Sequence, residues 1–532
     1  MTILAAAEPE LTPLLVICGY MALLIGLGVV TSRLSKGTAA DYFLVSRSVG
    51  SFLMLMSVFG TTMTGFAIVG SSGKAYSSGV GVYGLMASWS GLIHSACFFL
   101  IGIRMWAVGK RYGYVTQCEY FRERFNSPAL GYILFPILVL LVIPYLLVGV
   151  IGAGKAIQPI TAGAFPELFP VMRPDGTPSP LSGGIPPWLG MLAVCLIVLF
   201  YVFAGGLRGA VWANAFQTIV FMGTGLVAFF IIADRLGGMQ AASQAVAEHD
   251  AASVRLAREG QIGHLQFFTY CFIPLSVGMF PHLFQHWLTA KRAASFRLTV
   301  IAHPICIAIV WAPCIMIGIW AAGKFGTTVP DANTVLGRMV NQLVHLPWLS
   351  GLLGAGILAA IMSSLDSQFM CIGTMFTRDI VVRLVGKHRF TDREMIWLAR
   401  GFIVAIVAVT YVLALLLQKG THVFDLGVWC FSGFASLFPL AFAAVYWRRT
   451  TKAGAIACVL TTAAVWTVLF IHDMIEKQKL PPGQDDELLI AGMMPVTFIF
   501  AASVASLVIV SLLTKPPAAT TVTKFLPPKS SS

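Results

Sequence analysis

Two neighbouring serines and a carboxylate interrupt an apolar stretch late in the chain. Ser363, Ser364 and Asp366 follow Ala360 inside residues 349–374, which are otherwise apolar enough to cross a bilayer. Hard cations prefer oxygen ligands, and hydroxyls, backbone carbonyls and a carboxylate supply them. A carboxylate near the membrane centre costs about 2.5–3.5 kcal/mol on insertion scales, so it tends to be functional. The pattern predicts a cation site. The alternative is that both serines bond back to their own helix and Asp366 lies at its cytoplasmic end.

A second apolar stretch is unusually polar for a membrane helix. Residues 60–73, GTTMTGFAIVGSSG, hold three threonines, two serines and four glycines. Freed backbone groups are tolerated at membrane depth only where protein or a wet cavity satisfies them. Interrupted helices carry ion and substrate sites in secondary transporters, although small residues also line ordinary helix contacts. Pro274, Gly278 and Pro281 predict a second interrupted helix within residues 266–288.

Other chemistry finds little support in the sequence. His282 and His286 have a metal-like spacing on a helix, but no HExxH glutamate or nearby cysteine accompanies them, so zinc is not predicted. We expect His94 to be an interior polar residue rather than a proton carrier. Residues 149–155 match GxxxxGK by letter, yet Ala156 replaces the required Ser or Thr and the segment is an apolar helix. Neither an enzyme nor a bound cofactor is predicted.

The composition places these segments in a membrane protein. The chain has 532 residues, of which 57% are hydrophobic and 11% charged, and its mean hydropathy is +0.83. Apolar runs of some 20 residues indicate membrane helices. The sequence predicts an all-α integral membrane protein with thirteen such helices, at residues 11–30, 51–74, 79–103, 127–153, 188–204, 210–233, 266–288, 298–323, 349–374, 397–418, 422–446, 453–471 and 491–514.

Charge and length predict how these helices are arranged. The net charge of +13 fits cytoplasmic loops rich in Lys and Arg rather than nucleic-acid binding, and its distribution predicts an external N-terminus and a cytoplasmic C-terminus. The two interrupted helices open two groups of five, as in an inverted repeat. We expect one transmembrane domain over residues 1–514 and a disordered cytoplasmic tail over 515–532. Within the domain we expect a lead helix at 11–30, repeats at 51–234 and 266–447, and trailing helices at 453–514.

Five segments in order give the chain a resemblance to a known family. They are residues 41–44 with Arg47, 60–73, 205–217 (GGLRGAVWANAFQ), 280–291 (FPHLFQHWLTAK) and 359–368 (AAIMSSLDSQ). With them the chain resembles the sodium:solute symporter family over nearly its whole length. The resemblance implies the inverted-repeat fold of LeuT-type transporters, with alternating access driven by sodium.

The resemblance also implies a sodium site between the first and eighth core helices. Carried over position by position, its ligands are the backbone carbonyls of Gly60, Met63 and Ala360 and the hydroxyls of Ser363 and Ser364. Thr64 is implied to lie beside this site.

Two departures from the family pattern bear on coupling and substrate. Asn214 stands in WAN where many relatives have the aspartate of WTD, and many relatives lack the carboxylate found here at Asp366. We hypothesise that the charge has moved between two neighbouring helices, where it serves a second cation or a proton. Thr62 stands where the proline-transporting branch has an acidic residue, which weakens a proline assignment.

The expected solute pocket is aromatic and weakly polar. The sugar-transporting branch has Glu-Gln where this chain has Phe66 and Ala67, and a pocket for sugar needs many hydrogen-bonding partners. Helix N-termini at the breaks can hold a carboxylate through backbone N–H groups. A monocarboxylate or an amino acid is therefore favoured. The expected pocket residues are Thr61, Thr62, Thr64, Phe66, Tyr145, Tyr270, Phe272 and Trp429.

The resulting prediction is a multi-pass symporter of the plasma membrane, the inner membrane of a bacterium. Its partners would be a small organic solute, the sodium ion as coupling ion, and the lipid bilayer, with no nucleic acid. The alternatives are a proton-coupled symporter of the same fold and a transporter-like membrane sensor.

Overall fold

The fold is an all-α bundle. The computed structural model describes residues 10–34, 37–84, 89–173, 175–386, 389–418, 422–479 and 487–526, and within these ranges the only β contacts are isolated bridges. Among the described residues, ten helices are long and apolar enough to cross a membrane, or up to twelve if each of two bent pairs counts as one span. The predicted all-α membrane fold is confirmed. The count of thirteen stays a prediction.

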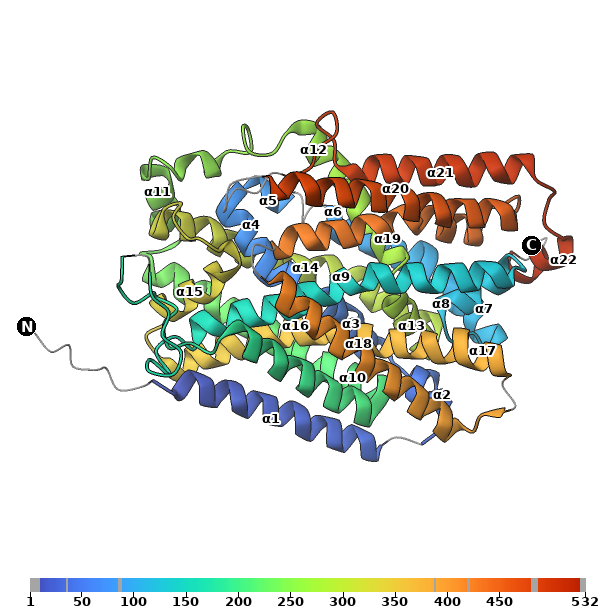
Figure 1. Ribbon diagram of the computed structural model, residues 1–532, viewed down its shortest axis with the longest axis horizontal. Coiled ribbons are helices and arrows are strands. Elements are labelled where there is room, and N and C mark those ends of the chain that lie inside the picture. The colour runs from blue at the N-terminus through green and yellow to red at the C-terminus, as the bar shows by residue number, and fades with distance from the viewer. Residues whose placement is uncertain are drawn as a thin grey trace, which may run out of the picture.

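The long helices run roughly along the long axis of the molecule (Figure 1). The ten membrane-length helical segments are α1 (Thr12–Arg33), Trp89–Tyr112 (α6, η4 and α7), α9 (Pro128–Ile160), α10 (Pro187–Arg235), Ala293–Phe325 (which includes α14, Phe296–Phe325), Pro347–Val385 (α16, η9 and α17), α18 (Asp392–Leu417), α19 (Val423–Tyr446), α20 (Lys452–Gln478) and α21 (Pro495–Leu513).

Both predicted interruptions are present as sharp bends. The first separates α3 (Ser51–Thr62) from the π-helix η2 (Phe66–Gly70) and α4 (Ser71–Ser78), with a bend of 59°. The second follows α12 (His264–Thr269) and the 3₁₀ helix η6 (Tyr270–Gly278) and precedes α13 (Pro281–Thr289), with a bend of 50°. Pro281 stands at the start of α13, where its missing N–H removes no helical bond. Whether the groups of helices that follow form an inverted repeat stays a prediction.

The 49-residue α10 consists of two helices joined at Gly206. This residue has φ +58°, outside the helical region. Gly209 also lies so near to Tyr201 that a Cβ on it would be 3.0 Å from the Tyr201 carbonyl oxygen. Residues eight apart in a straight helix would lie much farther from each other, so the chain turns back on itself at Gly206. The turn is held against α2 (Ala39–Leu44): Arg208 is paired with the buried carboxylate of Asp41, and Tyr42 packs against Gly206. Two of the segments that carry the family resemblance therefore contact each other directly.

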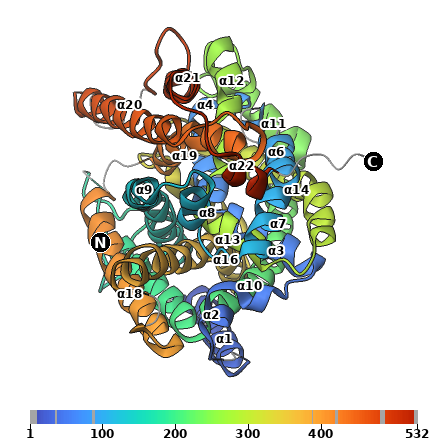
Figure 2. The ribbon, with the colours of Figure 1, turned by 90° about the vertical axis from the view of Figure 1, so that its right-hand side faces the viewer.

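Helix α16 (Pro347–Met375) lies at the centre of the bundle. In the apolar stretch of its membrane span, 89% of the residues are buried, whereas the share is 28% in each of α18, α20 and α21. The view along the bundle places α16 and α13 near the middle and α1, α18, α20 and α21 towards the outside (Figure 2). Polar side chains on α16 are therefore enclosed by protein rather than lipid, which is the condition under which a membrane tolerates them.

The C-terminal tail differs from its prediction. Disorder was expected beyond residue 515, but α22 (Ala519–Phe525) forms a short helix whose Phe525 is buried. The ring of Phe525 packs against those of Tyr112, Tyr114 and Tyr120. The tail is rich in Pro, Thr and Ser, which suggested that it has too little apolar surface to fold. The buried Phe525 ring supplies the apolar contact that α22 needs. Residues 527–532 lie outside the described ranges.

The turn at Gly206 generates a stability prediction. A Cβ at this position would lie 2.5 Å from the Tyr42 ring and would have to adopt a left-handed φ, so Gly206→Ala should destabilise the protein by about 1–3 kcal/mol or more. Gly223→Ala in the same helix is the control, since nothing lies within 4 Å of its Cβ position. Thermal unfolding in detergent should show a lower midpoint for Gly206→Ala only. Equal midpoints for the two variants would contradict the turn.

Candidate functional site

The first interrupted helix contacts α16 directly at its broken end. The Ser363 hydroxyl lies 2.8 Å from the Gly60 carbonyl oxygen and 2.9 Å from the Ala360 carbonyl oxygen. Gly60 also allows α3 to lie close to α10, because a Cβ there would lie 2.5 Å from the hydroxyl oxygen of Thr218. Three of the five sodium ligands implied by the family resemblance thus meet in the structure.

The other two implied ligands are arranged differently. Met63 lies in the extended link after α3, with ψ 112°. The amide of Ala67, which would bond to the Met63 carbonyl in a continuous helix, donates to the Thr64 carbonyl instead (3.0 Å). The break therefore releases the Met63 carbonyl from that helical bond. The Ser364 hydroxyl donates to the Ile361 carbonyl of its own helix (2.9 Å), which is the alternative arrangement considered for both serines.

Asp366 is fully buried and lies at the middle of the continuous span Pro347–Val385, not at its end. Its carboxylate accepts hydrogen bonds from the Ser367 hydroxyl (2.8 Å) and from the Tyr201 hydroxyl (3.1 Å) on α10. Asn214, also on α10, donates to Ser367 Oγ (3.0 Å). The two positions at which we placed the displaced charge, 214 and 366, therefore share one buried network.

The same network reaches both interrupted helices through His286. Its Nε2 lies 2.9 Å from Ser367 Oγ and its Nδ1 lies 2.6 Å from Ser57 Oγ. A hydroxyl has one proton and two lone pairs. Ser367 gives its proton to Asp366 and accepts from Asn214, so its second lone pair accepts from His286. With an ionised Asp366, His286 therefore carries its proton on Nε2, and Ser57 donates to Nδ1.

The His286 bridge lies one helical turn from the Gly60–Ser363 contact. Ser57 precedes Gly60 by three residues on α3, and Ser367 follows Ser363 by four on α16. Residues at these spacings share one face of a helix. Helices α3 and α16 are thus joined by two successive polar contacts, and α13 is tied to the second of them.

A small cavity lies beside the two breaks. It holds about 360 Å³ of space, part of it open to solvent, and is lined by four of the eight predicted pocket residues, namely Thr62, Phe66, Tyr145 and Tyr270. It is also lined by Ser90, His94, Ile273, Pro274, Ser276, Phe280, Trp311 and Phe431, which sequence reasoning did not assign to it. The polar side-chain groups are hydroxyls, the His94 imidazole and the Trp311 indole N–H, and no lining side chain among the described residues is a carboxylate, lysine or arginine.

The four remaining pocket candidates lie outside this lining. The Trp429 indole N–H donates to Asp473 on α20 (2.7 Å), and the Phe272 ring packs on Phe500 of α21 at 4.8 Å between centroids. The trailing helices therefore occupy the side to which both residues point. Thr64 accepts a hydrogen bond from the Phe66 amide (3.0 Å) and caps the second half of the broken helix. The hydroxyl of Thr61 is buried and has no hydrogen-bond partner among the described residues.

A second, larger cavity lies on the far side of two stacked rings. It encloses about 1390 Å³ and is lined by polar residues that include Lys74, Asp425 and Glu487. Lys74 is paired with Glu487 and lies 3.7 Å from Asp425. Phe424 lines this cavity and stacks on Phe66 of the small one, with centroids 4.8 Å apart. The stacked pair separates the two spaces.

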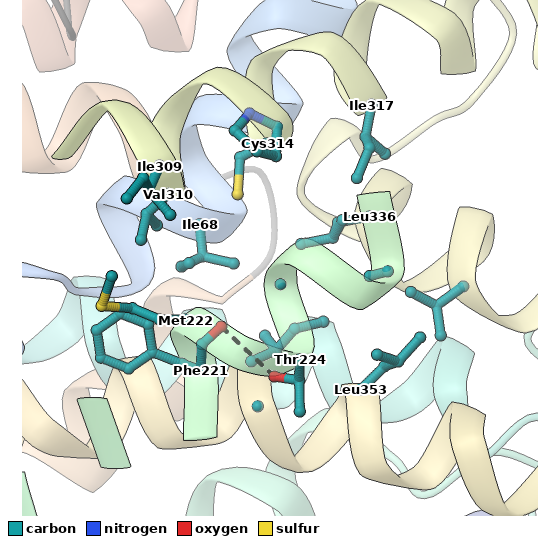
Figure 3. Close-up of a pocket in the computed structure, with 16 residues that line it drawn as sticks. Ile68, Phe221, Met222, Thr224, Ile309, Val310, Cys314, Ile317, Leu336 and Leu353 are labelled. Carbon is teal, nitrogen blue, oxygen red and sulfur yellow. Dashed lines mark hydrogen bonds between the residues drawn. The ribbon is translucent and has the colours of Figure 1, made fainter. Parts of the chain in front are cut away.

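A third cavity, between α10, α14 and α16, is apolar (Figure 3). It is lined by side chains such as Ile68, Phe221 and Leu353, and its hydroxyl group, that of Thr224, donates to the Val220 carbonyl of its own helix (2.8 Å). Because a solute site needs a few placed polar groups to orient its ligand, this cavity does not fit the solute expected here.

Several site residues were missed by sequence reasoning for identifiable reasons. Ser367 adjoins Asp366, and Ser57 lies one turn before Gly60, so both carried a positional signal. His286 was considered only for its spacing from His282, and both of its ring nitrogens contact serine hydroxyls instead. No sequence pattern pointed to Tyr201, because a tyrosine within an apolar run usually packs in the protein core.

Comparisons with known proteins show the family and the fold. A family model described as "Sodium:solute symporter family" matches residues 42–164 and 181–462. The sodium/proline symporter of Escherichia coli (strain K12) is 25% identical over 538 residues, covering 97% of this chain and 96% of that protein. A sodium/proline symporter of Staphylococcus aureus (strain bovine RF122 / ET3-1) is 25% identical over 524 residues, covering 95% of this chain and 93% of the relative.

Solved structures share the fold at lower identity. A Na⁺-coupled sialic acid symporter in a substrate-bound outward-open state superposes with a TM-score of 0.71 at 17% identity, covering 95% of this chain and 98% of that one. Mhp1, a nucleobase-cation-symport-1 family transporter, superposes with a TM-score of 0.54 at 14% identity, covering 91% and 97%. The family match extends over most of the sequence, and the chain therefore belongs to the sodium:solute symporter family.

Proposed function

We propose that this protein uses the sodium gradient to import a small organic solute that carries a carboxylate, either a monocarboxylate or an amino acid. The observation that carries the proposal is the contact of the Ser363 hydroxyl with the Gly60 and Ala360 carbonyls at the break of the first interrupted helix. The membrane potential supplies about 2.3 kcal/mol per charge per 100 mV to such an import.

The proposed sodium site uses oxygens that the break makes available. The Ser363 hydroxyl already lies within hydrogen-bonding distance of both the Gly60 and the Ala360 carbonyl oxygens. The carbonyl of Met63 is released by the break, and Ser364 becomes a ligand if its hydroxyl turns from the Ile361 carbonyl. A bound sodium ion would replace the direct Ser363–Gly60 hydrogen bond by ion–oxygen contacts, so the ion and the position of α3 against α16 are coupled.

The proposed solute site is the small cavity beside the breaks. Its aromatic walls suit an apolar body, and hydroxyls supply the few polar contacts. Phe280, which lines the cavity, is the N-cap of α13, and no side chain caps that helix end. The free N–H groups and the helix dipole at such an end favour a negative group. A carboxylate on the solute would satisfy them without an arginine.

The approach from the outside would pass through the larger polar cavity. Phe66 and Phe424 stack between it and the solute cavity, so these rings must part for a solute to enter. Asp366 and Asn214 would form a second coupling site for a cation or a proton, because they share Ser367 inside the protein.

Removing the Ser363 hydroxyl should weaken sodium binding. For Ser363→Ala we expect the sodium concentration giving half-maximal uptake to rise about tenfold, the effect of one lost charge-assisted contact. Thr377→Ala is the matched control on the same membrane span, since its hydroxyl bonds only back to the Gly373 carbonyl in the contacts seen here. Uptake into proteoliposomes against sodium concentration is the measurement. An unchanged sodium dependence in Ser363→Ala would exclude this serine as a ligand.

Neutralising Asp366 should change the coupling of transport. Asp366→Asn keeps the shape of the side chain but removes its charge, so we expect a lower sodium affinity or Hill coefficient if the second site takes a cation, and a flattened pH profile if it takes a proton. The double variant Asn214→Asp/Asp366→Asn should restore much of the lost dependence, because both positions contact Ser367. Asp234→Asn, at an exposed position on α10, is the control. If Asp366→Asn leaves both dependences as they were, the second site is not there.

The carboxylate requirement can be tested on the purified protein. In proteoliposomes with an inward sodium gradient, we expect labelled monocarboxylates or amino acids to accumulate and unlabelled ones to compete. The corresponding amides should compete at least about tenfold less well, because they lack the charge that the α13 N-terminus favours. Collapsing the sodium gradient should stop accumulation, and accumulation restored by a proton gradient alone would identify the proton-coupled alternative. Amides that compete as well as acids would exclude the carboxylate anchor.

A further inference from the structure

A cationic cavity lies at the end of the bundle where the C-terminal tail is docked. It holds about 1210 Å³ of space, part of it open to solvent, between the ends of α7 (Ile103–Tyr112) and α19, and residues of α22 line it. Arg104, Arg111, Arg448 and Lys524 line it, and no lining residue that the structure describes is acidic. Figure 1 shows α22 at the same end of the molecule as α7, and Figure 2 looks onto that end. The cavity is separate from the solute and sodium sites.

The tail is held in place by specific contacts, so the cavity is a built feature. The Tyr112 hydroxyl donates to the Lys524 carbonyl (3.3 Å), and Arg448 donates to the Leu526 carbonyl (3.1 Å). The Lys524 ammonium lies 4.8 Å from the centroid of the Tyr112 ring and 3.7 Å from the Glu123 carboxylate, which lies outside the lining. The tail, although it has few apolar residues, thereby adds the Lys524 cation to the three arginines that line the cavity.

The opposite wall of the cavity leads to an exposed apolar strip. The Arg104 guanidinium lies 4.4 Å from the centroid of the Tyr446 ring, and the Tyr446 hydroxyl donates to the Leu100 carbonyl (2.8 Å). One turn deeper on the same two helices, Leu100 is 43% exposed and Phe442 is 47% exposed. Cations and tyrosines above exposed apolar side chains match the layers of a bilayer interface.

We propose that this cavity binds the headgroup of an anionic phospholipid, whose phosphate contacts Arg104 and Arg111 and whose acyl chains lie along Leu100 and Phe442. Guanidinium groups bind phosphate oxygens in bidentate fashion. Arg104 and Arg111 in the lining favour an anion, and the exposed apolar strip favours a lipid over a soluble anion. The site goes beyond the proposed transport function and does not depend on it.

The test uses the purified full-length chain and synthetic lipids. Native mass spectrometry would measure the binding of phosphatidylglycerol and phosphatidylcholine from mixed micelles. Each cation near an anionic lipid surface adds about fivefold to affinity, so Arg104→Gln/Arg111→Gln should bind phosphatidylglycerol about 25-fold more weakly than the unaltered protein. Phosphatidylcholine binding should be weak in both. The double variant should keep its fold, because both arginines are exposed, and thermal unfolding checks this.

A matched control distinguishes a site from general surface charge. Arg383→Gln/Arg393→Gln removes two exposed cations that do not line the cavity, and it should retain phosphatidylglycerol binding. An equal loss in both double variants, or no preference for phosphatidylglycerol over phosphatidylcholine, would overturn the proposal. Competition by inorganic phosphate or glycerol phosphate at concentrations comparable to the lipid would assign the cavity to a soluble anion and would also overturn it. Sodium-driven uptake plays no part in these measurements, so failure of the transport proposal leaves them interpretable.

Discussion

The arrangement of the site depends on how closely the first interrupted helix approaches α16. At Gly60 the backbone of α3 comes so near to α10 that a Cβ would lie 2.5 Å from the Thr218 hydroxyl. The carbonyl of the same residue accepts a hydrogen bond from the Ser363 hydroxyl of α16 at 2.8 Å, just before the break frees further carbonyls. At membrane depth an unpaired backbone group is costly, so a broken helix is stable only where a neighbouring helix places hydroxyls opposite its backbone carbonyls. Helix α16 provides them.

The buried polar network extends this contact through the protein interior. Ser367 uses its proton and both lone pairs, on Asp366, Asn214 and His286, and His286 reaches Ser57. Removing one partner from such a network leaves a buried group unsatisfied, which costs about 1–3 kcal/mol. The two interrupted helices and α16 therefore cannot shift independently without breaking hydrogen bonds. A transporter that couples ion binding to movement of these helices needs such a linkage, because a ligand shifts a conformational equilibrium only through contacts that differ between the states.

Much of the fold and part of the site could be predicted from particular residues. Apolar runs indicated the membrane helices. Hydroxyl residues and glycines indicated the first break, at residues 63–65, and prolines with a glycine indicated the second, at residues 279–280. Local composition carried these signals because helix breaking is a local property. The pocket was predicted only in part: Thr62, Phe66, Tyr145 and Tyr270 line the cavity, while Trp429 and Phe272 face α20 and α21. Which face of a helix turns towards the pocket depends on helices distant in sequence, and the tail likewise folds only because Phe525 meets three distant tyrosines.

By itself, the sequence determined that this protein is an all-α membrane protein with two interrupted helices, and that oxygen-rich positions lie at residues 60–64 and 360–366. These features follow from hydropathy, backbone chemistry and residue type, which act within one segment. Only the tertiary structure decided that Ser363 rather than Ser364 contacts Gly60, that Asp366 and Asn214 share Ser367, and that His286 joins them to Ser57. Hydrogen bonds extend over about 3 Å, so a rotation of one helix by a single residue exchanges one partner for another, and no single segment specifies that rotation.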